Sequence, residues 1–447
     1  MVLFLYLFLI FTNAKKKRKI KYSVMVDAGS SGTRAHIYQW EKARRGIPNV
    51  IPSPSKENGL VLKSKIPLAK SHKNITIISE IFMPIIKFAT ENIPTKNFPT
   101  TRIFVYATAG VRLLDEKDRE FVINETYNFL EKYSPFKLKR RYVRCITGTE
   151  EGIYGWLSVN HLMNKLTSKS IFGKFRRFST GTIGALDMGG ASSQIAIQIK
   201  DSTESSSQHY IDLGYKTLKL FVHSYLGYGG NEALKSISRY LKETNTTYHP
   251  CYPMHCPVTY KGINFTGTGN FERCSELIEK VLLTKKEFKD IIIPHETNEY
   301  IAMASYYYLN NFLNLPLNST LNQLKSSAIQ FCAKNWSISF AENSNNPFLK
   351  SYCFSGVYQW NFLSRGFGFN DGKTSIVKTE NIEGVDLSWA IGAMLKEASD
   401  IEVDDNPFIS PEPLVVMNLF LALNFLITCL LGKRKKKLFA FKREECI

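Results

Sequence analysis

The stretch YSVMVDAGSSGTRAHIY, residues 22–38, has a closely similar counterpart later in the chain, and the pair indicates the architecture. The second copy is IGALDMGGASSQIAIQI, residues 183–199. Each is an apolar run that ends in an Asp, turns through Gly and Ser, and resumes as an alternating strand. One such hairpin is weak evidence by itself, but the pair predicts two related halves whose turns face a common ligand.

The residues of the two turns indicate that this ligand carries phosphate. Glycine lets the backbone approach a ligand closely, and successive N–H groups in such a turn form an anion-binding concavity. Serine hydroxyls add further donors. A carboxylate beside a phosphate would repel it unless a cation lies between them. Asp27 and Asp187 are therefore the predicted ligands, direct or through water, of Mg²⁺ or Ca²⁺. For either turn alone, an ordinary β-hairpin is the alternative.

The net charge of the 447-residue chain is +19, and most of this excess lies at the two ends. Residues 1–21 contribute +6 and residues 433–447 contribute +5, which leaves +8 for residues 22–432. A protein that binds nucleic acid would concentrate its positive charge on the folded part. We therefore expect no nucleic-acid partner.

Residues 414–431, LVVMNLFLALNFLITCLL, contain no charged side chain. Eighteen helical residues span about 27 Å, close to the thickness of a bilayer core. The basic sequence GKRKKK follows directly, and such a flank is typical of the cytosolic side of a membrane. The pattern predicts a transmembrane helix at 414–431 and a basic cytosolic tail at 432–447, with a buried core helix as the alternative.

The N-terminal segment, residues 1–21, has two interpretations. Residues 2–11 form an apolar run that is too short to span a bilayer and is suited to a signal-peptide core. A cleaved signal peptide and a short anchor with a lumen-facing continuation both fit this run. We therefore expect a protein that crosses the membrane once or twice.

Six cysteines lie between these two terminal segments, and no C-x-x-C pair among them suggests zinc. They are Cys145, Cys251, Cys256, Cys274, Cys332 and Cys353. Six N-x-S/T sequons accompany them. These cysteines fit disulfides in a secretory compartment, and with the sequons they favour a catalytic part on the lumenal or extracellular side of the membrane.

Patterns of strand and helix alternate through the rest of the chain, which predicts an α/β architecture. A Thr149 cap is expected to open the helix that carries Glu150 and Glu151 in its first turn. The expected helices cover residues 75–93, 118–133, 147–166, 216–243, 296–313 and 386–399.

Five motifs in order resemble the conserved regions of the apyrase, or nucleoside triphosphate diphosphohydrolase, family. They are DAGSSGTR, YATAGVRLL, TGTEEGIYGWLSVN, ALDMGGASSQIA and SWAIGAML, within about residues 22–400. The resemblance implies two related actin-like (ribonuclease H-like) domains with the active site in the cleft between them. It also implies hydrolysis of nucleoside di- and triphosphates, dependent on Ca²⁺ or Mg²⁺.

Residue by residue, the resemblance makes Glu151 the catalytic base that activates water, with Glu150 as the rival. Gln194 helps to hold the attacking water, and Asp27 and Asp187 match the metal-site aspartates. Trp389 matches the last motif and is expected to pack in the core. The residues that match the phosphate-binding regions are Ser30, Ser31, Gly32, Thr108, Ala109, Gly110, Gly189, Gly190, Ala191 and Ser192.

The resemblance also implies boundaries for the domains and pairings for the cysteines. The first domain covers residues 22–166, completed by the helix near 386–399, and the second covers residues 167–385. A linker at 400–413 then leads to the transmembrane helix. Cys332–Cys353 resembles a family disulfide and Cys251–Cys274 is the second expected pair, although Cys256 is able to replace either partner of the latter. Cys145 and Cys256 are left unassigned.

SYLGYGGNEA, residues 224–233, and FTGTGNFERCSE, residues 265–276, resemble the Golgi and endolysosomal branch of the family more than the cell-surface branch. Two other functions remain open for this fold. One is a non-hydrolytic ATPase like actin, chaperones or sugar kinases. The other is an inactive membrane glycoprotein that acts by binding. Retention of both aspartates, both turns and Glu151 favours the hydrolase.

Overall fold

The computed structural model describes residues 20–41, 47–53, 59–166, 181–213 and 217–404. The predicted transmembrane helix at 414–431, the cytosolic tail and most of the N-terminal segment lie outside these residues. So does most of the connection at 167–182. Among the described residues, no helix has both the length and the apolar character needed to cross a bilayer.

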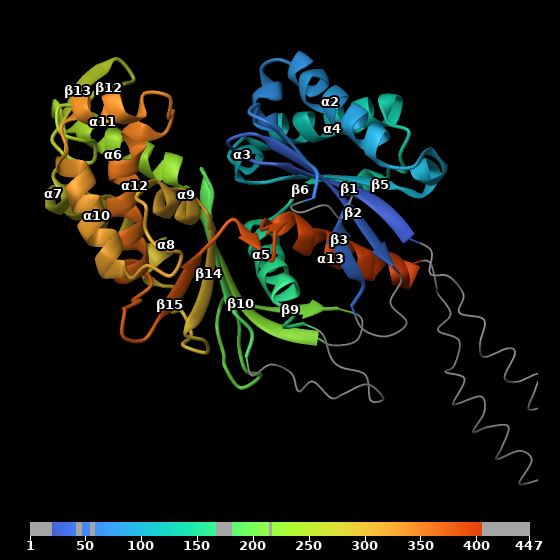
Figure 1. Cartoon of the computed structure of the whole chain (residues 1–447). Helices are drawn as coiled ribbons and strands as arrows, with labels where there is room; N and C mark the ends of the chain where they lie inside the picture. The colour runs from blue at the N-terminus through green and yellow to red at the C-terminus, as the bar shows by residue number, and fades with distance from the viewer. Residues whose placement is uncertain (1–19, 42–46, 54–58, 167–180, 214–216, 405–447) are drawn as a thin grey trace, which may run out of the picture. The chain divides into compact units, whose positions relative to one another are not determined.

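The first hairpin forms the centre of a mixed sheet in the first half of the chain (Figure 1). Strand β1 (Ile20–Ala28) pairs antiparallel with β2 (Thr33–Glu41) and parallel with β5 (Arg102–Ala107). The sheet is completed by β3 (Asn49–Pro52), β4 (Val61–Ser64) and β6 (Val143–Cys145). Its order is β3-β2-β1-β5-β6, with β4 also on β2.

The second hairpin occupies the same place in a second sheet. Strand β7 (Gly184–Met188) pairs antiparallel with β8 (Ser192–Gln198) and parallel with β14 (Glu299–Ala304). The remaining strands are β9 (Gln208–Asp212), β10 (Thr217–Leu226) and β15 (Ser375–Lys378). The order β15-β14-β7-β8-β10-β9 repeats the pairing of the first sheet around the hairpin. The two related α/β halves predicted from the paired hairpins are therefore present.

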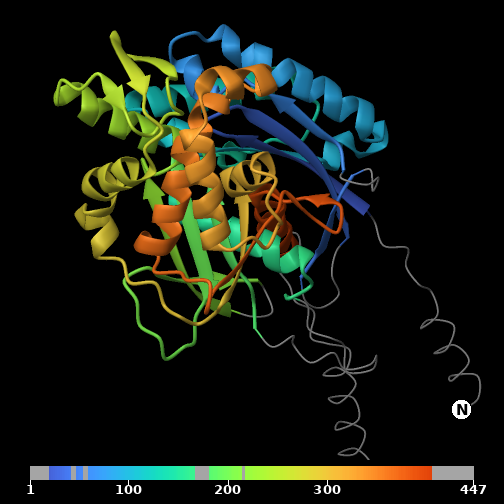
Figure 2. The same cartoon turned by 60° about the vertical axis from the view of Figure 1, so that its left-hand side comes forward.

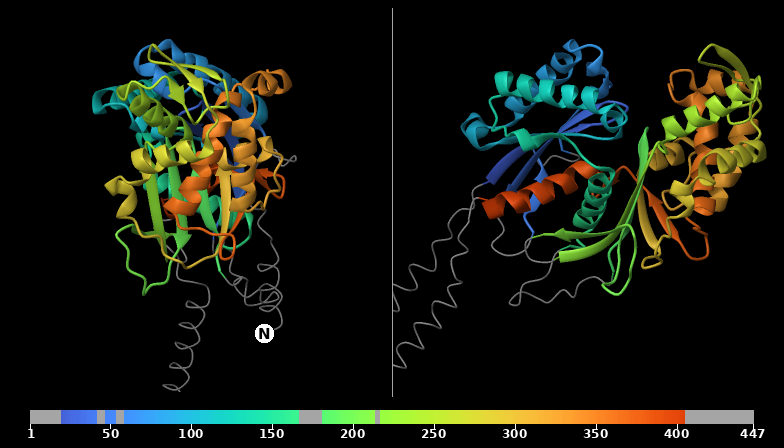
Figure 3. Two further views of the ribbon diagram at one scale, coloured as in Figure 1. Left: turned by 90° about the vertical axis from the view of Figure 1, so that its left-hand side faces the viewer. Right: turned by 180° about the vertical axis from the view of Figure 1, so that it is seen from behind.

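Helices cover each sheet. In the first half, α2 (Thr76–Asn92) and α4 (Glu116–Tyr133) lie on one face, where their apolar side chains share a buried core with β1 and β5. In the second half, α5 (Gly148–Leu162) packs against β7, β8 and β10 on one face of the sheet. Figures 2 and 3 show the helices of the other face. These are α6 (Gly230–Glu243), α7 (Phe271–Ile278), α9 (Ser305–Phe312), α10 (Leu321–Ala333) and α12 (Tyr352–Asn361).

Two expected helices are partly strands, and the prediction is wrong there. Residues 217–226 form β10 and residues 299–304 form β14, and a helix begins only after each strand. Both strands are buried on their two faces by helices, so they lack the alternation that marks a half-exposed strand. The expected cap Thr149 is also wrong. Thr147 caps α5, and its hydroxyl accepts from the Glu150 N–H while the Glu150 carboxylate accepts from the Thr147 N–H.

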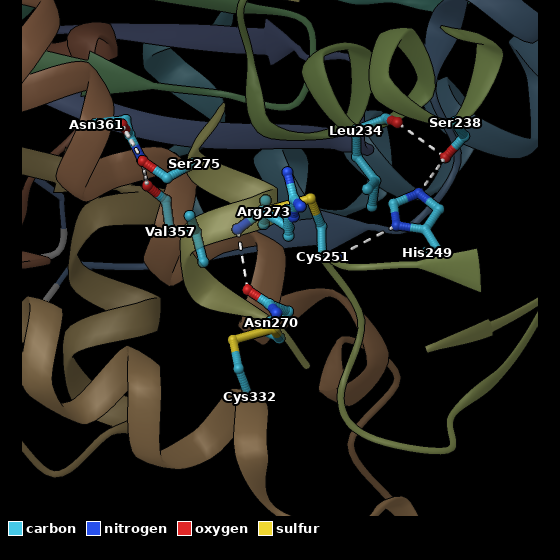
Figure 4. The surroundings of a disulfide bond; sticks show 12 residues. Leu234, Ser238, His249, Cys251, Asn270, Arg273, Ser275, Cys332, Val357 and Asn361 are labelled. Carbon is cyan, nitrogen blue, oxygen red and sulfur yellow. Dashed lines mark hydrogen bonds between the residues drawn. A yellow bond between two sulfur atoms is a disulfide. The ribbon is translucent and has the colours of Figure 1, made fainter. Parts of the chain in front are cut away.

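Two disulfides hold the second half together, and both are the pairs expected from the resemblance. Cys251 bonds to Cys274 and Cys332 bonds to Cys353. Cys145 and Cys256 are free thiols. Figure 4 shows a buried polar network beside the first disulfide. There, His249 accepts from the Cys251 N–H at 3.3 Å and contacts the Ser238 hydroxyl at 3.1 Å.

The final helix, α13, runs from Trp389 to Asp404, so it extends into the predicted linker at 400–413. Trp389 is 4% exposed and stacks on Tyr106 of β5, with ring centroids 6.4 Å apart. Tyr154 of α5 lies at the same distance on the same indole. The expected core-packing role of Trp389 is therefore correct.

Candidate active site

The two hairpin turns close in the same way. In the first turn, the Gly29 N–H donates to the Gly32 carbonyl at 2.9 Å. In the second, the Gly189 N–H donates to the Ser192 carbonyl at 3.0 Å. Because the closing bond joins residues three apart in both copies, the resemblance between the two sequence stretches extends to backbone geometry.

The structure also brings the two turns together. A Cβ atom built on Gly190 would lie 2.9 Å from the hydroxyls of both Ser30 and Ser31. It would also lie 2.8 Å from the side-chain nitrogen of Asn231, in the first turn of α6. Side-chain donors from two other segments, the Ser30–Ser31 turn and the start of α6, therefore converge on the Gly190 backbone. Such a cradle suits a phosphate group, which takes hydrogen bonds from several directions.

The YATAGVRLL motif packs directly against the first turn. The Thr108 N–H donates to the Ala28 carbonyl at 3.2 Å, at the end of β1. A Cβ on Gly110 would approach the Ser30 Cα to 2.8 Å, so glycine is needed there for the close approach of short helix α3 (Ala109–Arg112). Thr108 to Gly110 thus fix the position of the Ser30 turn.

Glu151 lies in the first turn of α5 and is 7% exposed. Its Oε2 atom accepts from Arg112 Nη2 at 2.7 Å and from Gln194 Nε2 at 3.2 Å. Arg112 and Gln194 also both donate to the Ser192 hydroxyl, at 3.2 Å and 2.8 Å. The carboxylate is therefore held directly beside the second turn by two fixed donors.

Glu150, the rival base, has a structural role in the same helix turn. Its carboxylate accepts from the Thr147 N–H at 2.8 Å in the capping box and from Arg144 Nη1 at 2.7 Å. Both oxygens of the Glu150 carboxylate therefore already accept hydrogen bonds from the protein. This arrangement favours Glu151 as the residue available to a ligand.

Three carboxylates with raised pKa values lie near one another. Burial raises the pKa of Asp27 to about 6, and the charge of Glu151 adds to this while Arg34 opposes it. Burial, followed by the charges of Glu151 and Asp27, raises the pKa of Asp187 to about 7. Burial also raises the pKa of Glu151, against the lowering effect of Arg112. Carboxylates that repel each other in this way are typical of functional sites.

The aspartates have the chemistry of a site for a hard cation. Asp27 Oδ1 is buried and has no hydrogen-bond partner, and Arg34 contacts only the other oxygen, at 3.4 Å. A divalent cation would satisfy that oxygen and relieve the repulsion between Asp27 and Asp187. The described residues contain no group of three or more His, Cys, Asp or Glu side chains arranged as a complete metal site. Mg²⁺ commonly binds through one or two carboxylates together with waters and substrate phosphates, so two aspartates fit it.

Sequence reasoning missed three side chains of the site: Arg112, Ser224 and Asn231. Arg112 stands in the YATAGVRLL motif, where its positive charge after a small-residue turn was an available signal. Ser224 contacts Gln194 at 3.0 Å from β10, and only the tertiary fold brings it there. Arg34 points toward Asp27, and its side chain is 40% exposed.

Several known proteins are similar to this chain over most of its length. Nucleoside-diphosphatase mig-23 of Caenorhabditis elegans is 30% identical over 422 residues, covering 84% of this chain and 76% of the relative. Ectonucleoside triphosphate diphosphohydrolase 1 of Bos taurus is 28% identical over 444 residues, covering 90% of this chain and 85% of the relative. A nucleoside triphosphate hydrolase structure from Neospora caninum has the same fold, with a TM-score of 0.63 at 14% identity over 90% of this chain and 96% of that one. Residues 13–412 match the GDA1/CD39 (nucleoside phosphatase) family, and the chain belongs to this family.

Proposed function

We propose that this protein hydrolyses the terminal phosphate of nucleoside di- and triphosphates, with Glu151 as the general base. The observation that carries the proposal is the position of the Glu151 carboxylate, held by Arg112 and Gln194 beside the Ser192 turn. The names of the two relatives, a nucleoside-diphosphatase and a nucleoside triphosphate diphosphohydrolase, support the substrate class.

The chain's own residues account for the steps of this reaction. The Ser30–Gly32 and Gly189–Ser192 turns bind the terminal phosphates through backbone N–H groups and hydroxyls, as an anion-binding cradle does. Gln194 orients the attacking water, and the Glu151 carboxylate takes its proton as the water attacks in line. Arg112 holds the carboxylate in one rotamer and balances its charge. Asp27 and Asp187 would hold Mg²⁺ or Ca²⁺, which when bound neutralises phosphate charge.

We further propose that residues 414–431 anchor the protein in a membrane, with the catalytic part on the lumenal or extracellular side. The two disulfides support an oxidising compartment. The resemblance of residues 224–233 and 265–276 to one branch of the family favours a Golgi or endolysosomal membrane. We also propose a first domain at 22–166, completed by the helix near 386–399, and a second domain at 167–385. Helix α5 belongs to the first of these segments and packs on the second sheet.

The test replaces each of the two neighbouring glutamates. We expect Glu151→Gln to lower kcat by about 10²- to 10⁴-fold, because it removes the general base and keeps the shape of the side chain. Phosphate release from UDP, GDP, ADP and ATP is measured with and without Ca²⁺ or Mg²⁺. Glu150→Gln is the matched control, which should weaken the cap of α5 and retain most of the turnover.

Two results would count against the proposal. Turnover of Glu151→Gln within a few-fold of the parent protein would remove Glu151 from the role of base. Absence of phosphate release from all four nucleotides by the parent protein would favour a binding role for the cradle.

A further inference from the structure

A pocket of about 270 Å³ lies beside Arg112, against the edge of the second sheet. Its walls come from the start of α5, from β9 with the residues before it, and from β10. Seven of its ten lining residues carry a side-chain hydrogen-bond donor, including Arg112, Ser207, His209, His223 and Ser224, and none is Asp or Glu. A pocket lined by donors without acids is suited to an anion.

Two histidines, His209 and His223, line the pocket. His223 Nδ1 contacts the Ser207 hydroxyl at 3.1 Å, which sets the orientation of its ring. The two rings lie near each other, since a protonated His209 would lower the pKa of His223. Burial lowers the pKa of each histidine below its ordinary value, and a neutral imidazole still carries one N–H donor. These donors are not used by the reaction proposed for Glu151.

Positive potential comes from two further sources. Gly148 and Thr149 are the first two residues of the 15-residue helix α5, and they line the pocket. The positive end of the α5 dipole is therefore directed there. The Arg112 guanidinium lines the same pocket while it bonds to Glu151 and Ser192 in the active site. Its pairing with Glu151 reduces the charge available to a second anion, which points to weak binding.

We propose that this pocket binds inorganic phosphate at a site separate from the cradle formed by the two hairpin turns. Phosphate bound there slows turnover because it competes with Glu151 for the Arg112 guanidinium. The inhibitory part of the proposal rests on the proposed function, because it assumes that Arg112 holds the catalytic base. The binding part does not depend on turnover. Phosphate is the small anion that the proposed reaction itself releases.

Direct binding is measured on the full-length protein with Mg²⁺ and a saturating non-hydrolysable nucleotide analogue in the cradle. Inorganic phosphate is then titrated by calorimetry. We expect the parent protein to bind phosphate under these conditions. His209→Ala/His223→Ala should bind it at least about tenfold more weakly, because two donors are lost. His295→Ala, an exposed histidine outside the pocket, is the control and should bind as the parent does.

A second variant tests the pocket independently, in case the double histidine variant does not fold. His209→Glu changes a half-buried side chain and places a carboxylate in the pocket, where it should repel phosphate. In steady-state assays, added phosphate should inhibit the parent non-competitively with respect to nucleotide, and both histidine variants should lose this inhibition with KM unchanged.

Three outcomes would overturn the proposal: absence of phosphate binding, binding unaffected by either histidine variant, or competition between phosphate and the nucleotide analogue. A protein that binds phosphate through both histidines yet hydrolyses no nucleotide would refute the proposed function and leave the binding site standing.

Discussion

At the scale of single residues, the state of Glu151 is set by two opposing neighbours. Burial at 7% exposure raises its pKa above the ordinary value of 4.5, while the Arg112 guanidinium at 2.7 Å lowers it. A general base works only when it is ionised. Activity should therefore be present above the pKa of Glu151 and be lost as the pH falls through it.

We predict that Arg112→Met moves the acid limb of the kcat/KM profile to higher pH, by about one unit or more. The cause is loss of the positive charge that keeps Glu151 ionised inside the protein. The profile is measured from pH 4.5 to 8, and Arg112→Lys should restore part of the shift. Arg144→Met is the control, since Arg144 bonds to Glu150 instead. An acid limb that does not move in Arg112→Met would mean that this arginine does not set the charge of the base.

The sequence predicted the positions of individual residues where they belong to a local motif. The paired Asp-Gly-Ser turns indicated that Ser30, Ser31 and Gly190 face one ligand, and the three do converge. Ser224 and Asn231 reach the site from β10 and α6; both lie in the stretch 224–233, which resembles one branch of the family but assigns neither residue to the site. Only the tertiary packing of distant segments identifies them.

At the scale of secondary structure elements, α5 and α13 touch through their backbones. The Gly392 N–H of α13 donates to the Ser158 hydroxyl of α5 at 2.9 Å. A Cβ at position 392 would lie 2.0 Å from the Tyr154 carbonyl and 2.8 Å from the Ser158 hydroxyl. Since α5 carries Glu151, this contact positions the base from the opposite end of the sequence.

We predict that Gly392→Ala lowers the free energy of unfolding by about 1–3 kcal/mol, because the added methyl group forces the two helices apart. Urea denaturation gives the value, and kcat should fall with it. Gly155→Ala in α5 is the control. Its Cβ would meet only the Met303 methyl at 3.8 Å, an ordinary contact. Alanine there should be neutral or stabilise the helix by about 0.5–1 kcal/mol. Equal effects of the two substitutions would show that α5 and α13 are not tightly coupled.

Two helices with one exposed face were predicted well, and two strands buried on both faces were not. Helices expected at 75–93 and 118–133 lie at Thr76–Asn92 and Glu116–Tyr133, where polar and apolar residues alternate at the helical period. Strands β10 and β14 are buried by helices on both sides, and neither shows the strict alternation of a half-exposed strand. Their identity depends on neighbours that the local sequence does not contain.

At the scale of the whole molecule, two sheets of one topology are stabilised by different means. The described residues of the first half contain no disulfide, and its core is built from β1, β5, α2 and α4. The second half has both disulfides, and one of them joins α10 to α12 across 21 residues of chain. Both cysteines of this pair are fully buried. The cross-link should therefore stabilise the second half against unfolding.

We predict that Cys332→Ala/Cys353→Ala lowers the free energy of unfolding by about 2–4 kcal/mol, since the unfolded chain regains the freedom of a loop closed over 21 residues. Hydrogen exchange read by mass spectrometry should show lost protection in α10 and α12, while β1 and β5 exchange as in the parent. Cys145→Ala, which removes a free, half-buried thiol in the first half, is the control and should leave the stability nearly unchanged. Equal loss of protection in both sheets would contradict this division, because it would mean that the two halves unfold as one cooperative unit.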